Sequence, residues 1–243
     1  MALILTIGSL AAFVSGIAQS CLGFGMALIM APCIMLIIEP MAVVPTVLLM
    51  SALNTFIIAA KSQRLIRWSL LLPLVIGGII GFTLGIQALL MLDPNVIRLF
   101  VGILVLLFTG VLWSGWRRPL PENPWTLGPV GLLSGFTGGS TSISGPPVVL
   151  FLTNQNTPRD AFRANLVCYF FIINCYGIVR LSLNGILNQQ VMIYAAAFLP
   201  ATLLGTLTGI YFSRKIPEKI FRQAVFMVLS IMGAMLLYNS LRA

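Results

Sequence analysis

The chain reads Gly138-Gly139-Ser140-Thr141-Ser142-Ile143-Ser144-Gly145-Pro146-Pro147 in the middle of an otherwise apolar region. These residues are small, hydroxyl-bearing or helix-breaking, and together they predict an interruption of a helix. Within a lipid bilayer, unwound backbone is tolerated only where protein buries it or where it lines a cavity, because every N–H and C=O group needs a partner. We therefore expect this interruption to hold a polar solute.

The composition around this motif is that of an integral membrane protein. Mean hydropathy is +1.04, and charged residues make up only 8% of the chain, against roughly 25% in soluble domains. Because one span needs roughly 20 apolar residues, the 243 residues leave no room for a soluble domain. The sequence predicts one all-α, multi-pass membrane domain over residues 1–243, placed in the inner or plasma membrane with the lipid bilayer as a partner.

The net charge of +9 does not indicate a nucleic-acid partner, because the basic residues gather in short connections and form no single patch. Such clusters are typical of cytoplasmic loops. The clusters are Lys61/Arg64/Arg67, Arg117/Arg118, Arg159/Arg163 and Arg214/Lys215/Lys219/Arg222.

Two apolar stretches, residues 2–38 and 125–154, differ from the others because glycine and polar residues occupy their middles. A helix over 126–137 would be about 18 Å long, too short for roughly 30 Å of hydrocarbon. If 125–154 enters and leaves on one side, as a hairpin of two half-helices, all four basic clusters become cytoplasmic and the C-terminus lies outside. A single crossing would divide the clusters between both sides, so we favour the hairpin. The full-length apolar segments are 41–60, 69–91, 96–116, 161–183, 190–212 and 220–240.

The two halves of the chain resemble each other weakly. Asn54 and Asn174 occupy matching places in their segments, and Pro73 and Gly78 match Pro200 and Gly205. We predict two inverted repeats, 1–116 and 125–243, joined by a cytoplasmic linker at 117–124. Each repeat would consist of a broken, re-entrant helical hairpin and three transmembrane helices, with the hairpin tips meeting near the midplane. Chance similarity between apolar segments is the alternative.

The candidate binding groups are the donors at the two interruptions. Unwound backbone, hydroxyls and the start of a half-helix all favour an anion. The asparagines can donate to a solute or cross-link helices, and Arg163 can guide anions or reach to the interface. A tight helix crossing that requires small residues is the structural alternative, and it is the expected role of Gly77/Gly81/Gly85 and Gly205/Gly209. The candidate substrate-binding residues are Gln19, Ser20, Gly23, Gly25, Asn54, Gly138, Gly139, Ser140, Thr141, Ser142, Ser144, Gly145, Arg163 and Asn174.

Several residue types are missing from the apolar segments. The chain has no histidine, and its five carboxylates all fall at segment ends or in connections. Membrane cation relays normally use buried carboxylates or histidines, so cation transport is disfavoured, and neither an enzyme nor a metal or other cofactor is expected. An anion leaving an inside-negative cell gains roughly 2.3 kcal/mol per charge per 100 mV, so its export needs no ion-coupling residue.

Three motifs resemble those of the TauE/SafE family of sulfite exporters and their relatives. These are Gly23-Phe-Gly25 followed by Pro32, the stretch Ala42 to Thr46, and Gly135 to Pro147 followed by Phe162-Arg-Ala-Asn165. The resemblance implies export of a small sulfur-containing anion such as sulfite or an organosulfonate. From the repeat and the hairpins we expect a transporter that works by alternating access around glycine- and serine-rich broken helices. A small-anion channel is the alternative, and a monomer or a homodimer are both open. Met26 stands where the family often continues its glycine run, and serines replace glycines around 140–144, so other small anions also stay open.

Overall fold

The computed structural model describes residues 2–59, 65–115, 120–155, 158–212 and 218–242. Within those ranges every regular element is a helix, as predicted. Six of the basic residues singled out from the sequence, and part of the predicted linker, lie outside the described residues. The helices are α1 Ala2–Leu22, α2 Met26–Met35, α3 Pro40–Ala59, α4 Trp68–Met91, α5 Pro94–Trp113, α6 Pro124–Thr141, α7 Gly145–Thr153, α8 Arg159–Leu183, α9 Gln189–Phe212 and α10 Glu218–Arg242.

Among the described residues, six helices are long and apolar enough to cross a membrane, namely α1, α3, α4, α5, α8 and α9. This finding confirms the all-α, multi-pass fold. Within α10, Val225–Ser240 is apolar but shorter than these six. Helix α6 has 18 residues, about 27 Å, and so continues beyond the short half-helix expected over 126–137. It is still not among the six candidate spans.

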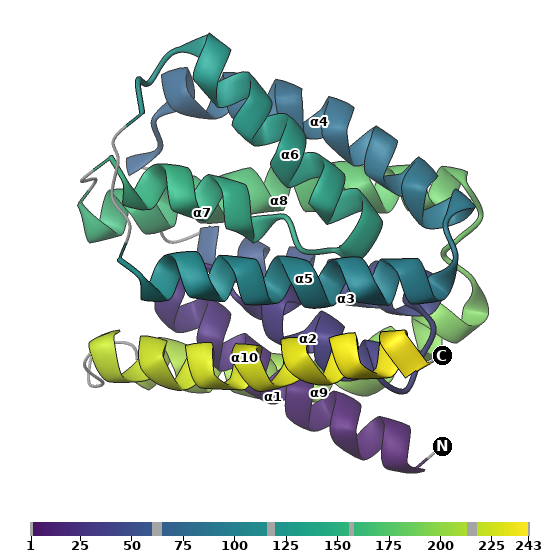
Figure 1. Ribbon diagram of the computed structural model, residues 1–243. Helices are drawn as coiled ribbons and strands as arrows, with labels where there is room; N and C mark the ends of the chain where they lie inside the picture. Colours follow the sequence, from purple (N-terminus) through teal and green to yellow (C-terminus); the bar gives the residue numbers. More distant parts are fainter. Residues whose placement is uncertain (1, 60–64, 116–119, 156–157, 213–217, 243) are drawn as a thin grey trace.

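The helix ends divide between two sides of the molecule (Figure 1). The starts of α4, α6, α8 and α10, which flank the basic clusters, lie on the left in this view, and both chain termini lie on the right. The α6–α7 hairpin opens to the left, whereas α1–α2 opens to the right. Trp68 begins α4, Trp113 ends α5 and Trp125 is the second residue of α6, and these residues are 54%, 56% and 89% exposed. Exposed tryptophans at helix ends are typical of a membrane interface.

The closest helix pairs each join one half of the chain to the other. Helix α4 packs along α6, α9 along α1, α5 against α10, and α3 against α8. Glycines let the backbones touch, because a Cβ added at Gly81 would lie 2.0 Å from the Leu132 carbonyl oxygen, and one at Gly205 would lie 2.1 Å from that of Phe13. The predicted close-packing role of these glycines is confirmed.

Candidate functional site

Two helices are interrupted by three residues each. Gly23-Phe24-Gly25 separates α1 from α2, and Ser142-Ile143-Ser144 separates α6 from α7. We call these the first and second break. The first residue of each has a left-handed backbone, with φ of 84° at Gly23 and 64° at Ser142. The third residues differ, because Gly25 is again left-handed at φ 115° whereas Ser144 has φ −86°. The two breaks thus begin alike but end differently, and they lie 119 residues apart in the sequence.

The second break is narrower than the sequence predicted. We expected unwound backbone over 138–145, but α6 stays helical through Thr141. Ser140 Oγ donates to the Phe136 carbonyl at 2.8 Å, and Thr141 Oγ1 donates to the Thr137 carbonyl at 2.6 Å. Hydroxyls that bond back to the preceding helical turn are compatible with a continuous helix. The prediction of unwound backbone from Gly138 to Thr141 was therefore wrong.

The two glycines of this stretch serve helix contact. A Cβ added at Gly139 would lie 2.3 Å from the Phe82 carbonyl oxygen of α4, and one at Gly138 would lie 2.9 Å from Ser144 Cβ. Absence of a side chain at both positions therefore lets α6 approach α4 and lets the chain fold back after the second break. Glycine is needed here for space and not for unwinding.

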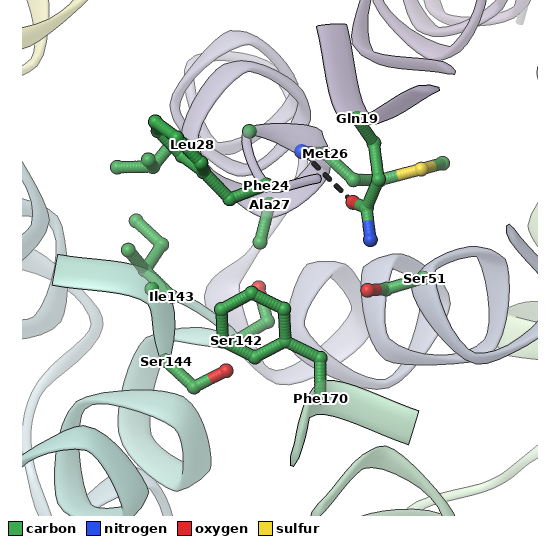
Figure 2. Close-up of a pocket in the computed structure, with 12 residues that line it drawn as sticks. Gln19, Phe24, Met26, Ala27, Leu28, Ser51, Ser142, Ile143, Ser144 and Phe170 are labelled. Atoms are coloured by element: carbon green, nitrogen blue, oxygen red, sulfur yellow. Dashed lines mark hydrogen bonds between the residues drawn. The ribbon is translucent and has the colours of Figure 1, made fainter. Parts of the chain in front are cut away.

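The two breaks meet at one cavity of about 20 Å³ (Figure 2). That volume holds about one water molecule, so a larger solute requires its walls to move apart. The wall combines apolar side chains (Phe24, Leu28, Ile143, Phe170) with polar ones (Gln19, Ser51, Ser142, Ser144). The lining residues are Gln19, Phe24, Gly25, Met26, Ala27, Leu28, Ser51, Ser142, Ile143, Ser144, Gly145 and Phe170.

The cavity includes some of the residues singled out from the sequence and leaves others outside. Gln19, Gly25, Ser142, Ser144 and Gly145 line it. The predicted residues that do not line this cavity are Ser20, Gly23, Asn54, Gly138, Gly139, Ser140, Thr141, Arg163 and Asn174.

Sequence reasoning missed two residues of the wall that lie on spanning helices. Ser51 stands three residues before Asn54 on α3, and Phe170 stands four residues before Asn174 on α8. Residues three and four apart share a helix face. This spacing from the two asparagines is the signal that could have found them.

Gln19 presents its amino group to the cavity. Its Oε1 accepts a hydrogen bond from the Met26 backbone N–H at 3.1 Å. Because a backbone N–H can only donate, this contact fixes which end of the amide is oxygen. The Nε2 group then points toward the cavity (Figure 2), and the residue is only 2% exposed. No described residue accepts a hydrogen bond from Nε2.

Side chains also satisfy the backbone of the second break. Ser134 Oγ donates to the Ser144 carbonyl at 2.5 Å and accepts from Tyr169 at 2.9 Å. The Ser142 hydroxyl donates to the Thr141 carbonyl at 2.5 Å. The Ser144 hydroxyl lines the cavity and makes no hydrogen bond with a described residue.

Two predicted residues lie close to the first break. Asn54 Nδ2 is 3.3 Å from the sulfur of Met26, and its Oδ1 is buried with no hydrogen-bond partner among the described residues. The Arg163 side chain covers the break, since a Cβ added at Gly23 would lie 3.1 Å from Arg163 Cγ. Arg163 therefore contacts the outside of the break and is not part of the cavity wall.

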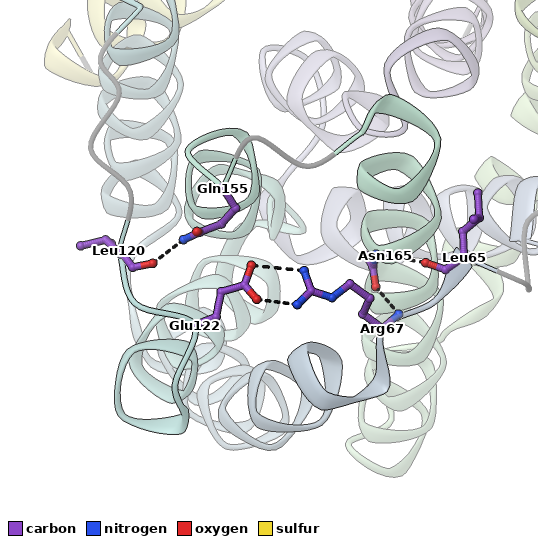
Figure 3. Close-up of polar contacts among 6 residues, drawn as sticks. All are labelled: Leu65, Arg67, Leu120, Glu122, Gln155 and Asn165. Carbon is purple, nitrogen blue, oxygen red and sulfur yellow. Dashed lines mark hydrogen bonds and ion pairs between the residues drawn. The ribbon is translucent and has the colours of Figure 1, made fainter.

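On the side where the basic residues gather, polar contacts join three segments (Figure 3). The Arg67 guanidinium donates to both oxygens of Glu122, at 2.6 and 3.3 Å. Asn165 Oδ1 accepts from the Arg67 backbone N–H at 2.9 Å. These contacts tie the starts of α4 and α8 to the segment preceding α6. The ion pair is partly exposed, so it adds little to stability by itself.

Six membrane-length helices among the described residues, two broken helices and a cavity lined by both breaks define a class of protein. Broken helices around a buried site near the interface of two bundle halves are the plan of many secondary transporters. The chain has the parts of a multi-pass membrane transport protein.

The chain belongs to the sulfite exporter TauE/SafE family, whose model matches residues 8–236. A curated relative from Cupriavidus necator, named probable sulfite/organosulfonate exporter TauE, is 25% identical over 234 residues, which cover 93% of this chain and 90% of the relative. No solved structure matches the chain. The resemblance stated from the motifs is confirmed, and membership in a family of exporters points to transport and away from enzymatic catalysis.

Proposed function

We propose that this protein exports a small sulfur-containing oxyanion, sulfite or an organosulfonate, from the cytoplasm. The observation that carries the proposal is the cavity between the two breaks, where buried donors from both halves of the chain converge. The family and the name of the curated relative support the choice of substrate. We place the protein in the inner or plasma membrane, with the basic helix ends in the cytoplasm.

The chemistry of the cavity suits an anion. Met26 and Gly145, the first residues of α2 and α7, both line it. The first amides of a helix have no partner within that helix, and they carry partial positive charge. At α7 the Gly145 N–H is the available amide, because Pro146 and Pro147 carry none, and at α2 the Met26 N–H already donates to Gln19 Oε1. The Gly145 N–H, the partial positive charge of both helix ends, the Gln19 amino group and the Ser144 hydroxyl can replace the water that an oxyanion loses on entry. Neutral donors also allow release, which a buried cation would oppose.

The transport step that we propose is a rocking of two inverted repeats around the cavity. Two observations support this step. In each half the first helix of the hairpin, α1 or α6, packs along a helix of the other half, α9 or α4. The two hairpins also open to opposite sides (Figure 1). The cavity would then open to one side at a time.

Uptake of labelled anions into proteoliposomes tests the proposal, with sulfite and methanesulfonate as probes and with or without an imposed potential. Replacing Ser144 by alanine should weaken substrate binding about 10-fold, because a hydrogen bond to a charged group contributes roughly 1.5–3 kcal/mol. Ser230→Ala is the matched control, since that hydroxyl bonds within α10 to the Phe226 carbonyl. The proposal is wrong if the wild-type protein transports neither anion. It is also wrong if Ser144→Ala and Ser230→Ala transport the anions equally well. Single-channel currents would favour a channel instead.

A further inference from the structure

Ser51 differs from most hydroxyl residues of the spanning helices. Thr46, Thr109 and Thr206 each donate to the carbonyl four residues earlier, at 2.7 to 2.8 Å. Ser51 Oγ makes no such bond, although the residue is only 8% exposed. The Ser51 hydroxyl instead lines the cavity, where Figure 2 shows its oxygen directed into the space between the breaks.

A hydrogen bond from Asn174 determines in which direction the Ser51 hydroxyl can donate its proton. Its Nδ2 group donates to Ser51 Oγ at 3.0 Å, and Asn174 itself is 2% exposed and does not line the cavity. A hydroxyl has one proton and two lone pairs. Because one lone pair receives the Asn174 proton, the Ser51 proton must point elsewhere. Among the described residues no acceptor takes it, so the open direction is the cavity.

Gln19 is likewise oriented toward the cavity by a hydrogen bond from outside it. The Met26 N–H fixes the amide from outside the cavity and leaves the amino group facing inward. Two donors on the first half of the chain, Gln19 on α1 and Ser51 on α3, are thus oriented before any solute arrives. A pre-oriented donor binds more tightly than one that must first reorganise. The bond that orients Ser51 comes from α8, in the other half.

We infer that Ser51 donates a hydrogen bond to the transported anion and that Asn174 is its positioning residue. This inference rests on the proposed function. The sequence left open whether Asn174 is a direct ligand or a cross-link between helices, and this inference assigns it a bond across helices that serves the ligand indirectly. It also makes the Ser51–Asn174 bond a link across the two halves at the site itself.

Affinity measurements on the full-length protein in lipid nanodiscs, with sulfite and methanesulfonate as probes, test the inference through a double-mutant cycle. Ser51→Ala and Asn174→Leu should each weaken binding about 10-fold. The double variant should be no weaker than Ser51→Ala alone, because Asn174 acts only through that hydroxyl. Ser51→Thr, which keeps the hydroxyl, should bind nearly as wild type.

Asn165→Leu provides the matched control. Asn165 is a buried asparagine on the same helix that bonds to Ala161, Leu65 and Arg67 and does not line the cavity. Any loss that it causes should be the same with Ser51 present or absent. If the losses from Ser51→Ala and Asn174→Leu multiply, or if Ser51→Ala binds both anions as wild type does, the inference is wrong while the proposed function stands. If wild-type protein binds neither anion, both are wrong.

Discussion

The contact between α4 and α6 gives the sharpest test of how the two halves pack. In Gly81→Ala the new Cβ would lie 2.0 Å from the Leu132 carbonyl oxygen, whereas ordinary contact begins at 3.4 Å. Both groups belong to helix backbones, so no side chain can rotate away and the helices must separate by about 1.4 Å at this point. Overpacking typically costs 1–3 kcal/mol. Since the obstacle is main chain, we expect about 3 kcal/mol of destabilisation.

This cost should appear as a lower midpoint of thermal unfolding in detergent micelles. For a chain of this size, 1 kcal/mol shifts the midpoint by roughly 2–4 °C, so Gly81→Ala should unfold roughly 6–12 °C below wild type. Gly205→Ala should behave alike, because its Cβ would lie 2.1 Å from the Phe13 carbonyl oxygen in the α9–α1 pair. Gly110→Ala on α5 meets nothing within 4 Å and should keep or raise the midpoint. If all three variants unfold within 2 °C of one another, the backbone contact is not as described.

Two further outcomes are expected. Gly23→Ala should slow transport, because its φ of 84° disfavours a side chain and the new Cβ would approach Arg163 Cγ to 3.1 Å. Gly115→Ala is the control. Its φ is also positive, at 65°, but the space around it is open, so the transport rate should stay unchanged. Equal rates for these two variants would show that the geometry of the first break is unimportant for transport. A reporter fused to the C-terminus should be active outside the cytoplasm, and one inserted between α5 and α6 should be active inside. Signals on the same side would disprove the re-entrant arrangement.

The spanning helices were predictable because the length of an apolar run sets the length of a span. The segments predicted over 41–60 and 69–91 correspond to Pro40–Ala59 and Trp68–Met91. The width of the second break was not predictable from composition. A serine or threonine hydroxyl can either favour a non-helical backbone or bond to the carbonyl of the preceding helical turn. At Ser140 and Thr141 only the packing of α6 on α4 decides between these two outcomes.

The candidate site was predicted in part for a similar reason. Gln19, Gly25, Ser142, Ser144 and Gly145 belong to or border the interruptions, which the sequence marks with glycine and serine. Ser51 and Phe170 stand in continuous helices, and they reach the cavity only because α3 packs against α8. Their spacing of three and four residues from Asn54 and Asn174 indicates a shared helix face, but no local pattern specifies that these faces of α3 and α8 meet at the cavity. The repeat boundaries and the inverted relation stay predictions.

The packing of α1 against α9, which lie near opposite ends of the chain, has a consequence for how the protein is synthesised. Helix α1 leaves the ribosome first, but the surface that covers it, α9, is among the last segments to be made. Until then the small residues along α1 face lipid or a temporary partner, and insertion of the early helices cannot by itself produce the mature packing. Assembly of this molecule is therefore a late event that closes the chain onto its own beginning. Translation that stops before α9 would leave α1 without its partner, exposed to quality-control proteases of the membrane.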